Sequence, residues 1–273
     1  MKVATIILNR NLPEITNNLY EHIKFYDGEI SDIFVVEAGS DNTKLSKYCT
    51  WHVNDEETIK NGLRYSRGMN FALSELVKTD KFENYDYYFL ITNDTELDNC
   101  KTIENLLNIM KSHDRLGILS PCSKNWGEKY FLKDQATKYF WFIHNTAYFI
   151  SRKCISDICT LKNPDLMNFL FDGTNFRGFG SEHELIAKGY ANNWASAITS
   201  SVWANENESH LITKADKIKT ESYDENKSLY IEEGRNWMRN KYGFNSHWAM
   251  QNYVKMFYES FFKNHPEYIK YKL

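Results

Sequence analysis

The first candidate for a ligand-binding residue in this 273-residue chain is Asp94, which follows an apolar run. The run covers residues 87–91 and leads directly into Thr92, Asn93 and Asp94. A carboxylate at the end of a buried strand could hold a divalent cation on a nucleotide diphosphate, because Mg²⁺ and Mn²⁺ prefer oxygen ligands. The cation would neutralise the charge that develops on a departing nucleoside diphosphate. The alternative is an ordinary turn or helix cap, to which these residue types are equally suited.

Three more polar groups occur where a ligand crevice would form. Glu37 follows the apolar run 33–36 and could accept hydrogen bonds from ribose hydroxyls or from a base edge. Gly39 and Ser40 come next and would let a ligand approach the backbone closely. Arg67 could bind a phosphate. The alternatives are a solvated carboxylate at a strand edge and a surface ion pair.

A serine, two glutamates and a histidine stand together at residues 181–184. Ser181 can cap a helix there, and carboxylates in a first turn interact favourably with the helix dipole. Glu182 or His183 could also serve as a general base. His210 lies farther along in a polar stretch, where a single histidine is ordinarily solvated.

Apolar runs alternate with helical periodicity in the first half of the chain, which predicts an α/β fold with a mostly parallel sheet and crossover helices. We expect helices around 12–23, 69–77 and 103–110, where apolar residues recur at three- and four-residue spacing. The predicted strands cover residues 3–8, 33–36, 87–91 and 117–119. Asn9, Glu37 and Asp94 all fall at the carboxyl ends of these strands, where ligands of such sheets bind.

The second half has a different pattern. An aromatic stretch at 139–150 and a glycine-containing segment at 172–180 precede a predicted helix start near 181, and a further strand is predicted at 195–203. Residues 205–227 are polar with few apolar anchors, so we expect a long loop that is either a mobile lid or plain surface. Helical periodicity resumes at about 228 and carries an aromatic stripe. We expect this stripe to dock on the parent domain, with membrane-surface or dimer contact as the alternative; it consists of Trp248, Tyr253, Phe257 and Phe261.

Bulk composition excludes some classes of protein. A net charge of −3 gives no basic field for a nucleic-acid backbone, so we expect no nucleic-acid partner. Five scattered cysteines match neither a zinc site nor a disulfide framework, which indicates reduced thiols. No apolar run reaches membrane-spanning length, and we expect a cytoplasmic protein, at most peripheral at the inner face of a membrane.

Four segments, in order, resemble the family 2 type of inverting GT-A glycosyltransferases. The first resembles the family's nucleotide-contacting loop, the second its second strand and loop, the third the pattern that precedes the metal-binding strand, and the fourth the glycine-rich segment that carries the catalytic base. The segments are LNRN at 8–11, VVEAGSDN at 35–42, RYSRGMNFA at 64–72 and FRGFGSEHEL at 176–185.

The resemblance implies a GT-A fold, a Rossmann-like sheet flanked by helices, over residues 1–210, with a nucleotide-binding half to about 120 and an acceptor half from about 121. Residues 211–273 would be a loop and a C-terminal helical extension. Asp94 and His210 would hold Mn²⁺ or Mg²⁺, and Glu182 would be the base, with His183 as the competitor because relatives usually have glutamate then aspartate here. The residues implied to contact the nucleotide sugar are Asn9, Arg10, Glu37, Gly39, Ser40, Arg67, Asn70, Asn93 and Asp94.

The activity implied is inverting transfer of a sugar from a nucleotide-diphosphate donor to a hydroxyl of a glycan or lipid-linked acceptor, in the synthesis of cell-surface polysaccharide or glycoconjugate. Thr92 departs from the family, in which an acidic residue is common two positions before the metal-binding aspartate. This departure leaves open a degenerate module that binds sugar nucleotide or glycan without turnover. A sugar-phosphate nucleotidyltransferase is the third alternative, although no glycine-rich phosphate loop follows the first strand.

Overall fold

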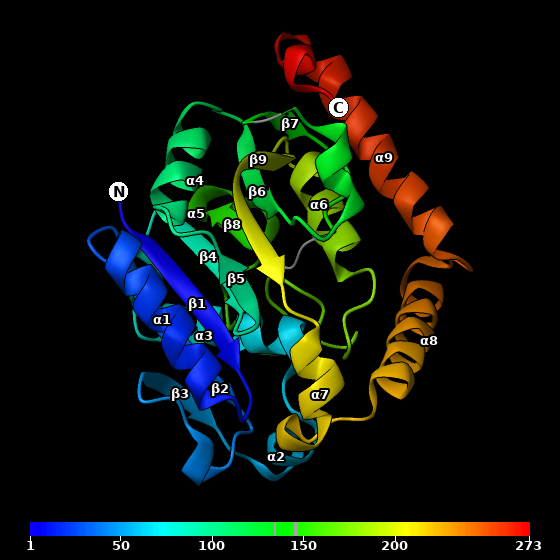
Figure 1. Ribbon diagram of the computed structural model, residues 1–273. Helices are drawn as coiled ribbons and strands as arrows, with labels where there is room; N and C mark the ends of the chain where they lie inside the picture. Colours follow the sequence, from blue (N-terminus) through cyan, green and yellow to red (C-terminus); the bar gives the residue numbers. More distant parts are fainter. Residues whose placement is uncertain (134, 145–146) are drawn as a thin grey trace.

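The computed structural model describes residues 1–133, 135–144 and 147–273, which form a central sheet with helices on both faces (Figure 1). The strands are β1 (Val3–Asn9), β2 (Ser31–Ala38), β3 (Cys49–Val53), β4 (Tyr87–Thr92), β5 (Thr95–Leu97), β6 (Leu116–Cys122), β7 (Thr137–Tyr139), β8 (Tyr148–Ser151) and β9 (Ala195–Glu206). The α-helices are α1 (Pro13–Asp27), α2 (Glu56–Asn61), α3 (Arg64–Lys78), α4 (Thr102–Lys111), α5 (Arg152–Ile158), α6 (Ser181–Ala191), α7 (Ser209–Ile218), α8 (Tyr223–Tyr242) and α9 (His247–Asn264). Short 3₁₀ helices cover Asn42–Lys44, Phe82–Asn84, Gly127–Phe131 and Pro266–Tyr271.

The strands of the described chain form one sheet in the order β3-β2-β1-β4-β8-β6-β9-β5, and β7 pairs with β9. The first four strands in this order run parallel, as do β6 and β9. β8 lies antiparallel between β4 and β6, and β5 and β7 are antiparallel to β9. The sheet is therefore mixed, with four parallel strands continued by antiparallel pairing through β8.

β1 and β4, in the middle of the sheet, are buried on both faces, which is why these strands are continuous apolar runs. Every residue of β1 is buried, and α3 packs closely on this strand. The contact is made at Gly68, where an added Cβ would lie 2.4 Å from Leu8 Cδ1. A glycine is thus required for α3 to bring its first turn to the carboxyl end of β1.

The predicted strands at 3–8, 33–36, 87–91, 117–119 and 195–203 are confirmed, as are the helices around 12–23, 69–77 and 103–110. The sequence did not indicate β3 or β8. β3 is an edge strand of partly exposed residues without clean alternation, and β8 is hidden inside an aromatic stretch.

The prediction of a long loop at 205–227 is wrong. β9 continues to Glu206 because its end pairs with β5, and α7 and the start of α8 occupy most of the remainder. None of the residues of α7 is fully buried. Its apolar residues Leu211, Ala215 and Ile218 recur at helical spacing, and Leu211 and Ile218 line a pocket, so the pattern was present among the polar residues but was not recognised. It lies across the end of the sheet toward which β1 and β9 point (Figure 1).

The C-terminal helices pack against the same core as the sheet. Tyr258 and Phe261 of α9 are 1% and 2% exposed and belong to the main apolar cluster, whereas Trp248 is 69% exposed. Most of the aromatic stripe thus docks on the parent fold as expected, and the division at residue 210 stays a prediction. Among the described helices, none combines the length and apolar character needed to cross a bilayer.

Asn70 gives a test of how α3 holds the loop that contains Leu166 and Phe171. Its buried amide donates to the carbonyls of Leu166 (3.2 Å) and Phe171 (2.7 Å) and accepts from the Phe171 amide (3.0 Å). Asn70→Ala would leave these backbone groups unpaired, so we expect the free energy of unfolding in urea to fall by about 2–3 kcal/mol. Asn105→Ala, at an exposed position of α4, is the matched control and should change it by less than about 0.5 kcal/mol.

Candidate functional site

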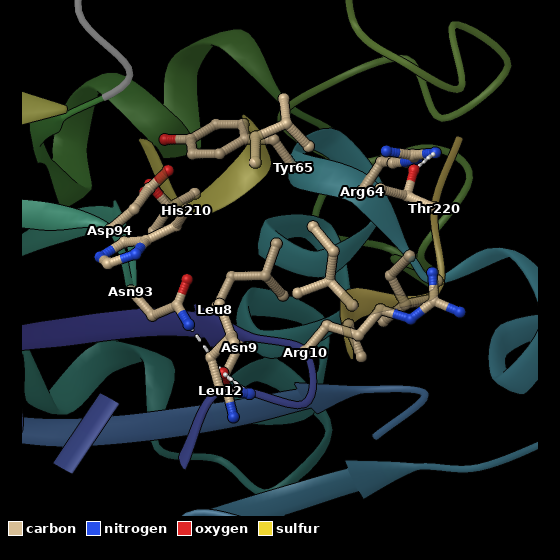
Figure 2. A pocket seen from close by; sticks show the side chains of 16 residues that line it. Leu8, Asn9, Arg10, Leu12, Arg64, Tyr65, Asn93, Asp94, His210 and Thr220 are labelled. Carbon is tan, nitrogen blue, oxygen red and sulfur yellow. Dashed lines mark hydrogen bonds between the residues drawn. The ribbon is translucent and has the colours of Figure 1, made fainter. Parts of the chain in front are cut away.

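A pocket of about 210 Å³ lies at the carboxyl ends of β1 and β4, between the start of α3 and the underside of α7 (Figure 2). Figure 2 shows Asp94 and His210 on one side of the pocket and Arg10 and Arg64 on the other. The lining residues are Leu8, Asn9, Arg10, Leu12, Ala38, Gly62, Leu63, Arg64, Tyr65, Thr92, Asn93, Asp94, His210, Leu211, Ile218 and Thr220. The pocket therefore joins one cationic end and one acidic end through an apolar middle.

Two arginines form the cationic end. Arg10 Nη2 donates to the carbonyls of Ile59 (2.9 Å) and Lys60 (3.1 Å), so no carboxylate takes up these hydrogen bonds. Burial, followed by the nearby charge of Arg64, lowers the pKa of Arg10 to about 10. The first turn of α3 also faces the pocket, and free amides at a helix start favour an anion.

Backbone strain is concentrated at the same end. Asn11 and Arg64 have φ values of 58° and 56°, in the left-handed region that non-glycine residues rarely occupy. Gly62, with φ 72°, is needed because an added Cβ would lie 2.7 Å from Arg10 Nη1. Such strain persists only where the surroundings impose it, and here it sets the positions of both arginines.

Asp94 and His210 form the acidic end of the pocket, and Glu206 lies beside Asp94 outside the pocket lining. The Asn207 amide donates to the Asp94 carbonyl (3.0 Å), and the pairing of Thr95 with Glu206 brings β9 beside Asp94. Asp94 Oδ1 is buried and has no hydrogen-bond partner among the described residues. Burial raises the pKa of Asp94, and burial together with the Asp94 charge raises that of Glu206 to about 8. The two carboxyl groups disfavour each other's ionisation, which a bound cation would reverse.

A lysine competes for the histidine of this end. Lys214 Nζ lies 2.9 Å from His210 Nδ1 and donates to its lone pair. Lys214 has non-helical dihedral angles (φ −128°, ψ 19°) that kink α7 at this point. The pKa of His210 is lowered by burial and by the Lys214 charge, so the imidazole is neutral near pH 7. The ammonium thus sits where a metal ion would bind that nitrogen.

Four of the predicted nucleotide-contacting residues form a buried network behind the pocket. Glu37 accepts hydrogen bonds from Asn9 Nδ2 (2.8 Å) and Ser40 Oγ (2.5 Å) through Oε2, and from the Ser46 amide (2.7 Å) through Oε1. Asn9 Oδ1 in turn accepts from Asn93 Nδ2 (2.7 Å). Asn9 and Asn93 line the pocket, whereas Glu37 and Ser40 do not.

Three further predicted residues also lie outside the pocket lining. Gly39 faces α2, where an added Cβ would lie 2.0 Å from the Thr58 carbonyl oxygen. Arg67 donates through Nε to the Gly173 carbonyl (2.8 Å), and Asn70 holds the loop described above. In this structure Gly39, Arg67 and Asn70 contact other parts of the protein, and their roles toward a ligand stay predictions.

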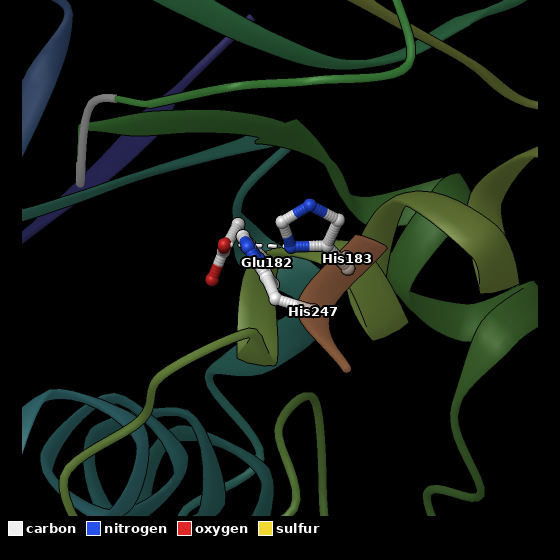
Figure 3. Close-up of side chains that lie close together, drawn as sticks. All are labelled: Glu182, His183 and His247. Carbon is white, nitrogen blue, oxygen red and sulfur yellow. Dashed lines mark ion pairs between the residues drawn. The ribbon is translucent and has the colours of Figure 1, made fainter. Parts of the chain in front are cut away.

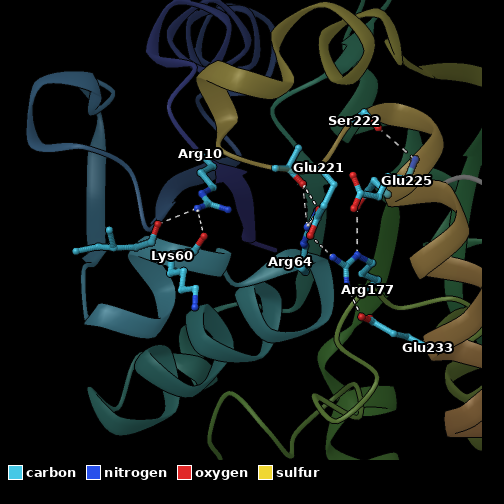
Figure 4. A network of polar contacts seen from close by, with 11 residues as sticks. Arg10, Lys60, Arg64, Arg177, Glu221, Ser222, Glu225 and Glu233 are labelled. Carbon is cyan, nitrogen blue, oxygen red and sulfur yellow. Dashed lines mark hydrogen bonds and ion pairs between the residues drawn. The ribbon is translucent and has the colours of Figure 1, made fainter.

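The end of α7 and the residues that follow it, 217–222, are held over the cationic end (Figure 4). Asn11 Nδ2 donates to the Lys217 carbonyl (2.9 Å), and Arg64 pairs with Glu221 (3.0 Å). Arg177 pairs with the same glutamate and with Glu233 of α8. Burial would raise the pKa of Glu221, but hydrogen bonds and the two arginines lower it to about 2.

The two predicted catalytic residues lie at the start of α6, beside the start of α9 (Figure 3). His183 Nδ1 is 2.7 Å from Glu182 Oε1, and the rings of His183 and His247 are 4.6 Å apart. Burial alone would raise the pKa of Glu182, but the neighbouring His183 outweighs it and the pKa lies below its usual value. Burial and the His183 charge lower the pKa of His247 to about 4.

Two tyrosines lie between this cluster and the pocket. Tyr65 lines the pocket and contacts Tyr148, with ring centroids 5.9 Å apart, and the Glu182 charge helps to raise the pKa of Tyr148. The turn before α6 also approaches α3, because an added Cβ on Gly178 would lie 3.5 Å from Ser66 Oγ. Glu182 therefore faces the region beside the pocket.

A second hollow, of about 360 Å³, is lined by Trp126 and by Glu206, the glutamate beside Asp94. The Trp126 ring lies 4.3 Å from that of His144, and Phe142 lies 5.5 Å from His183. By contrast, Tyr139, at the start of the aromatic stretch, is fully buried. Of that stretch, only its later part reaches the site.

Three residues of the site were not predicted from the sequence. Arg64 stands in the same motif as Arg67, and the start of a helix at the sheet's carboxyl edge was a signal that favoured it. Glu206 and His247 gave no local signal, because their place depends on the pairing of β9 with β5 and on the docking of α9.

The sequence matches no protein-family profile and no curated protein. Among solved structures, residues 1–349 of S. aureus TarS in complex with UDP align with 88% of this chain and 74% of that chain, at 10% identity and a TM-score of 0.51. Full S. aureus TarS aligns with a TM-score of 0.50 and 10% identity, over 87% of this chain and 44% of that one. A mannosyltransferase from Pyrobaculum calidifontis, PcManGT, solved with GDP-Man and Mn²⁺, covers 72% of this chain and 54% of its own at 11% identity and a TM-score of 0.48. The likeness confirms the GT-A-like glycosyltransferase fold and, at this identity, the fold alone.

The two pocket arginines predict an anion site that can be measured directly. Arg64→Ala should weaken the binding of inorganic pyrophosphate at least tenfold by calorimetry, since a charge-assisted hydrogen bond contributes about 1.5–3 kcal/mol. Arg67→Ala, three residues along the same helix but outside the pocket, is the control and should leave affinity within about twofold. Equal losses in both variants would contradict this assignment.

Proposed function

We propose that the chain is a glycosyltransferase that moves a sugar from a nucleotide-diphosphate donor to a hydroxyl of a glycan or lipid-linked acceptor with inversion. One observation carries the proposal: a single pocket at the carboxyl end of a GT-A-like sheet combines two arginines with an aspartate, Asp94, whose Oδ1 is buried without a hydrogen-bond partner among the described residues. The likeness to TarS, which was solved with UDP, supports a nucleotide diphosphate as the ligand. The product would be a cell-surface polysaccharide or glycoconjugate made on the cytoplasmic side.

The donor would lie along the pocket. Leu8, Leu12 and Ala38 offer an apolar surface for the base, while Asn9 and Asn93 offer amides held in place by Glu37. Arg10 and Arg64 would bind the diphosphate. Because about 210 Å³ is less than the roughly 300–1,000 Å³ of typical ligand sites, α7 and residues 217–222 would have to move as the donor enters.

Asp94 and His210, with Glu206 beside them, fit a divalent cation because Asp94 Oδ1 is buried without a partner and the two carboxyl groups repel each other. Mn²⁺ or Mg²⁺ held there would neutralise charge on the departing diphosphate. The arginines at the other end would stabilise the same charge from the protein side.

Glu182 is the proposed base, with His183 as the competitor. A carboxylate whose pKa lies below its usual value is ionised at neutral pH and can accept the proton of an acceptor hydroxyl. The hollow beside Trp126 would receive the acceptor. An indole face stacks on a sugar ring, and Glu206 can form hydrogen bonds with the sugar's hydroxyl groups. His183 would then orient Glu182, or take the proton itself.

A panel of sugar nucleotides with Mn²⁺ tests the reaction class. We expect release of nucleoside diphosphate by the wild type, and loss of this metal-dependent release in Asp94→Asn but not in the exposed control Asp114→Asn. Release of pyrophosphate would instead identify a nucleotidyltransferase. Binding of donor without any release would identify a degenerate module.

The base is assigned by two substitutions at the start of α6. Glu182→Gln should lower the rate of transfer by about 10²- to 10⁴-fold while leaving donor binding intact, because a positioned base contributes that much. His183→Ala should cost less. The opposite order of the two losses would assign the base role to His183.

Lys214 predicts a change in metal affinity. Lys214→Ala removes the ammonium that occupies His210 Nδ1, so we expect Mn²⁺ to bind severalfold more tightly when free Mn²⁺ is followed by electron paramagnetic resonance. Lys217→Ala, an exposed position of the same helix, should not change affinity. Unchanged Mn²⁺ affinity with loss of turnover in Lys214→Ala would mean that the lysine itself supplies the positive charge.

A further inference from the structure

A second group of metal-binding side chains lies away from the acidic end of the pocket. One ligand atom from each of Glu182, His183 and His247 lies within 4.8 Å of the others, and these residues come from the starts of two different helices (Figure 3). We propose that they form a site for a divalent transition metal that accepts nitrogen ligands, such as Zn²⁺. The site is distinct from the Asp94–His210 end, whose oxygen-rich chemistry suits Mn²⁺ or Mg²⁺.

The hydrogen bonding of the imidazoles supports this assignment. His183 is fully buried, yet neither of its ring nitrogens has a hydrogen-bond partner in the described part of the chain. Its Nδ1 is 2.7 Å from Glu182 Oε1 but off the direction of a hydrogen bond. His247 Nε2 is buried and unpartnered as well. Buried polar atoms are almost always paired, so the buried imidazole nitrogens of His183 and His247 that lack a hydrogen-bond partner beside the Glu182 carboxylate indicate a missing ligand.

The geometry needs only small changes to bind a metal. A tetrahedral Zn²⁺ with bonds of about 2.0–2.1 Å keeps its donor atoms roughly 3.3 Å apart. The present separations run from 2.7 Å to at most 4.8 Å, so rotations of the Glu182 and His247 side chains would suffice. Three protein ligands are also the number found in zinc sites that keep a fourth position for water or substrate.

The surroundings hold the three ligands and leave them available. Phe179 packs on His247 with ring centroids 4.5 Å apart, and Phe142 packs on His183 at 5.5 Å, so an apolar shell surrounds the imidazoles. Glu184, two residues from Glu182, is engaged elsewhere, by Tyr242 (2.6 Å) and Lys241 (2.7 Å). Of these two glutamates, Glu182 is the one free to bind a metal.

Metal binding at this site would occupy Glu182, the residue proposed as the base, and it is measured without the transfer activity. Co²⁺ replaces Zn²⁺ in such sites and absorbs visible light strongly when four-coordinate. We expect the full-length wild type to develop this absorption with one equivalent of Co²⁺, to lose it on addition of Zn²⁺, and to keep it in His210→Ala, the matched control from the other end. His247→Ala should weaken Co²⁺ binding at least tenfold.

Glu182→Gln provides a second variant, because its side chain is partly exposed and the change preserves shape. It should weaken Co²⁺ binding as His247→Ala does, with circular dichroism confirming that both variants are folded. The proposal is overturned if the wild type gives no such absorption, or if His210→Ala abolishes it while His247→Ala and Glu182→Gln retain it. Absence of sugar transfer would leave the spectrum unchanged, so the two proposals fail separately.

Discussion

The pairing of the end of β9 with β5 is the interaction on which the arrangement of the site depends. β5 is only three residues long, yet its register places Glu206 opposite Thr95 and the Asn207 amide on the Asp94 carbonyl. A single-residue slip would turn Glu206 to the other face of the sheet, because side chains alternate along a strand. The same pairing determines where α7 begins, and so where His210 and Lys214 lie relative to Asp94.

The arginines around the cationic end of the pocket account for the ion pairs made by the residues near it. Arg64 and Arg177 share Glu221, which keeps that carboxylate ionised and holds residues 217–222 near the cationic end. A diphosphate would compete with Glu221 for Arg64. Separating Arg64 from Glu221 would cost energy. The stronger attraction between Arg64 and a doubly charged diphosphate would offset this cost, so ligand binding could drive the movement of α7 and residues 217–222.

Much of the fold followed from the sequence, because buried parallel strands and amphipathic helices leave simple periodic patterns. Asn9, Asn93 and Asp94 were also predictable, since each ends an apolar run. Glu37 and Ser40 were predicted near the ligand for the same reason, but a strand-end carboxylate can equally be turned inward, and three hydrogen bonds from the chain turn Glu37 that way.

Residues contributed by tertiary pairing were the ones that the sequence could not reveal. Arg64 and Arg67 are both plausible phosphate ligands by type and motif, and only the left-handed backbone at Arg64 and the loop at Gly173 separate them. His247 lies in an ordinary capped helix start. It reaches His183 and Glu182 only because α9 docks against α6. α7 carries an apolar face of only three residues, Leu211, Ala215 and Ile218, within a strongly polar segment, so the polar composition hid the helix.

The position of β8 has a consequence for how the chain is made. β4 lies between β1 and β8, so one edge of this fully apolar strand stays open until residues 148–151 have been synthesised and can pair. The main core continues to Phe262 of α9, so its last layer is added later still. Contacts that span so much of the chain form slowly, and an unpaired apolar strand edge invites association with other chains. Synthesis between β4 and β8 is therefore the interval in which a nascent chain of this protein most needs protection from aggregation.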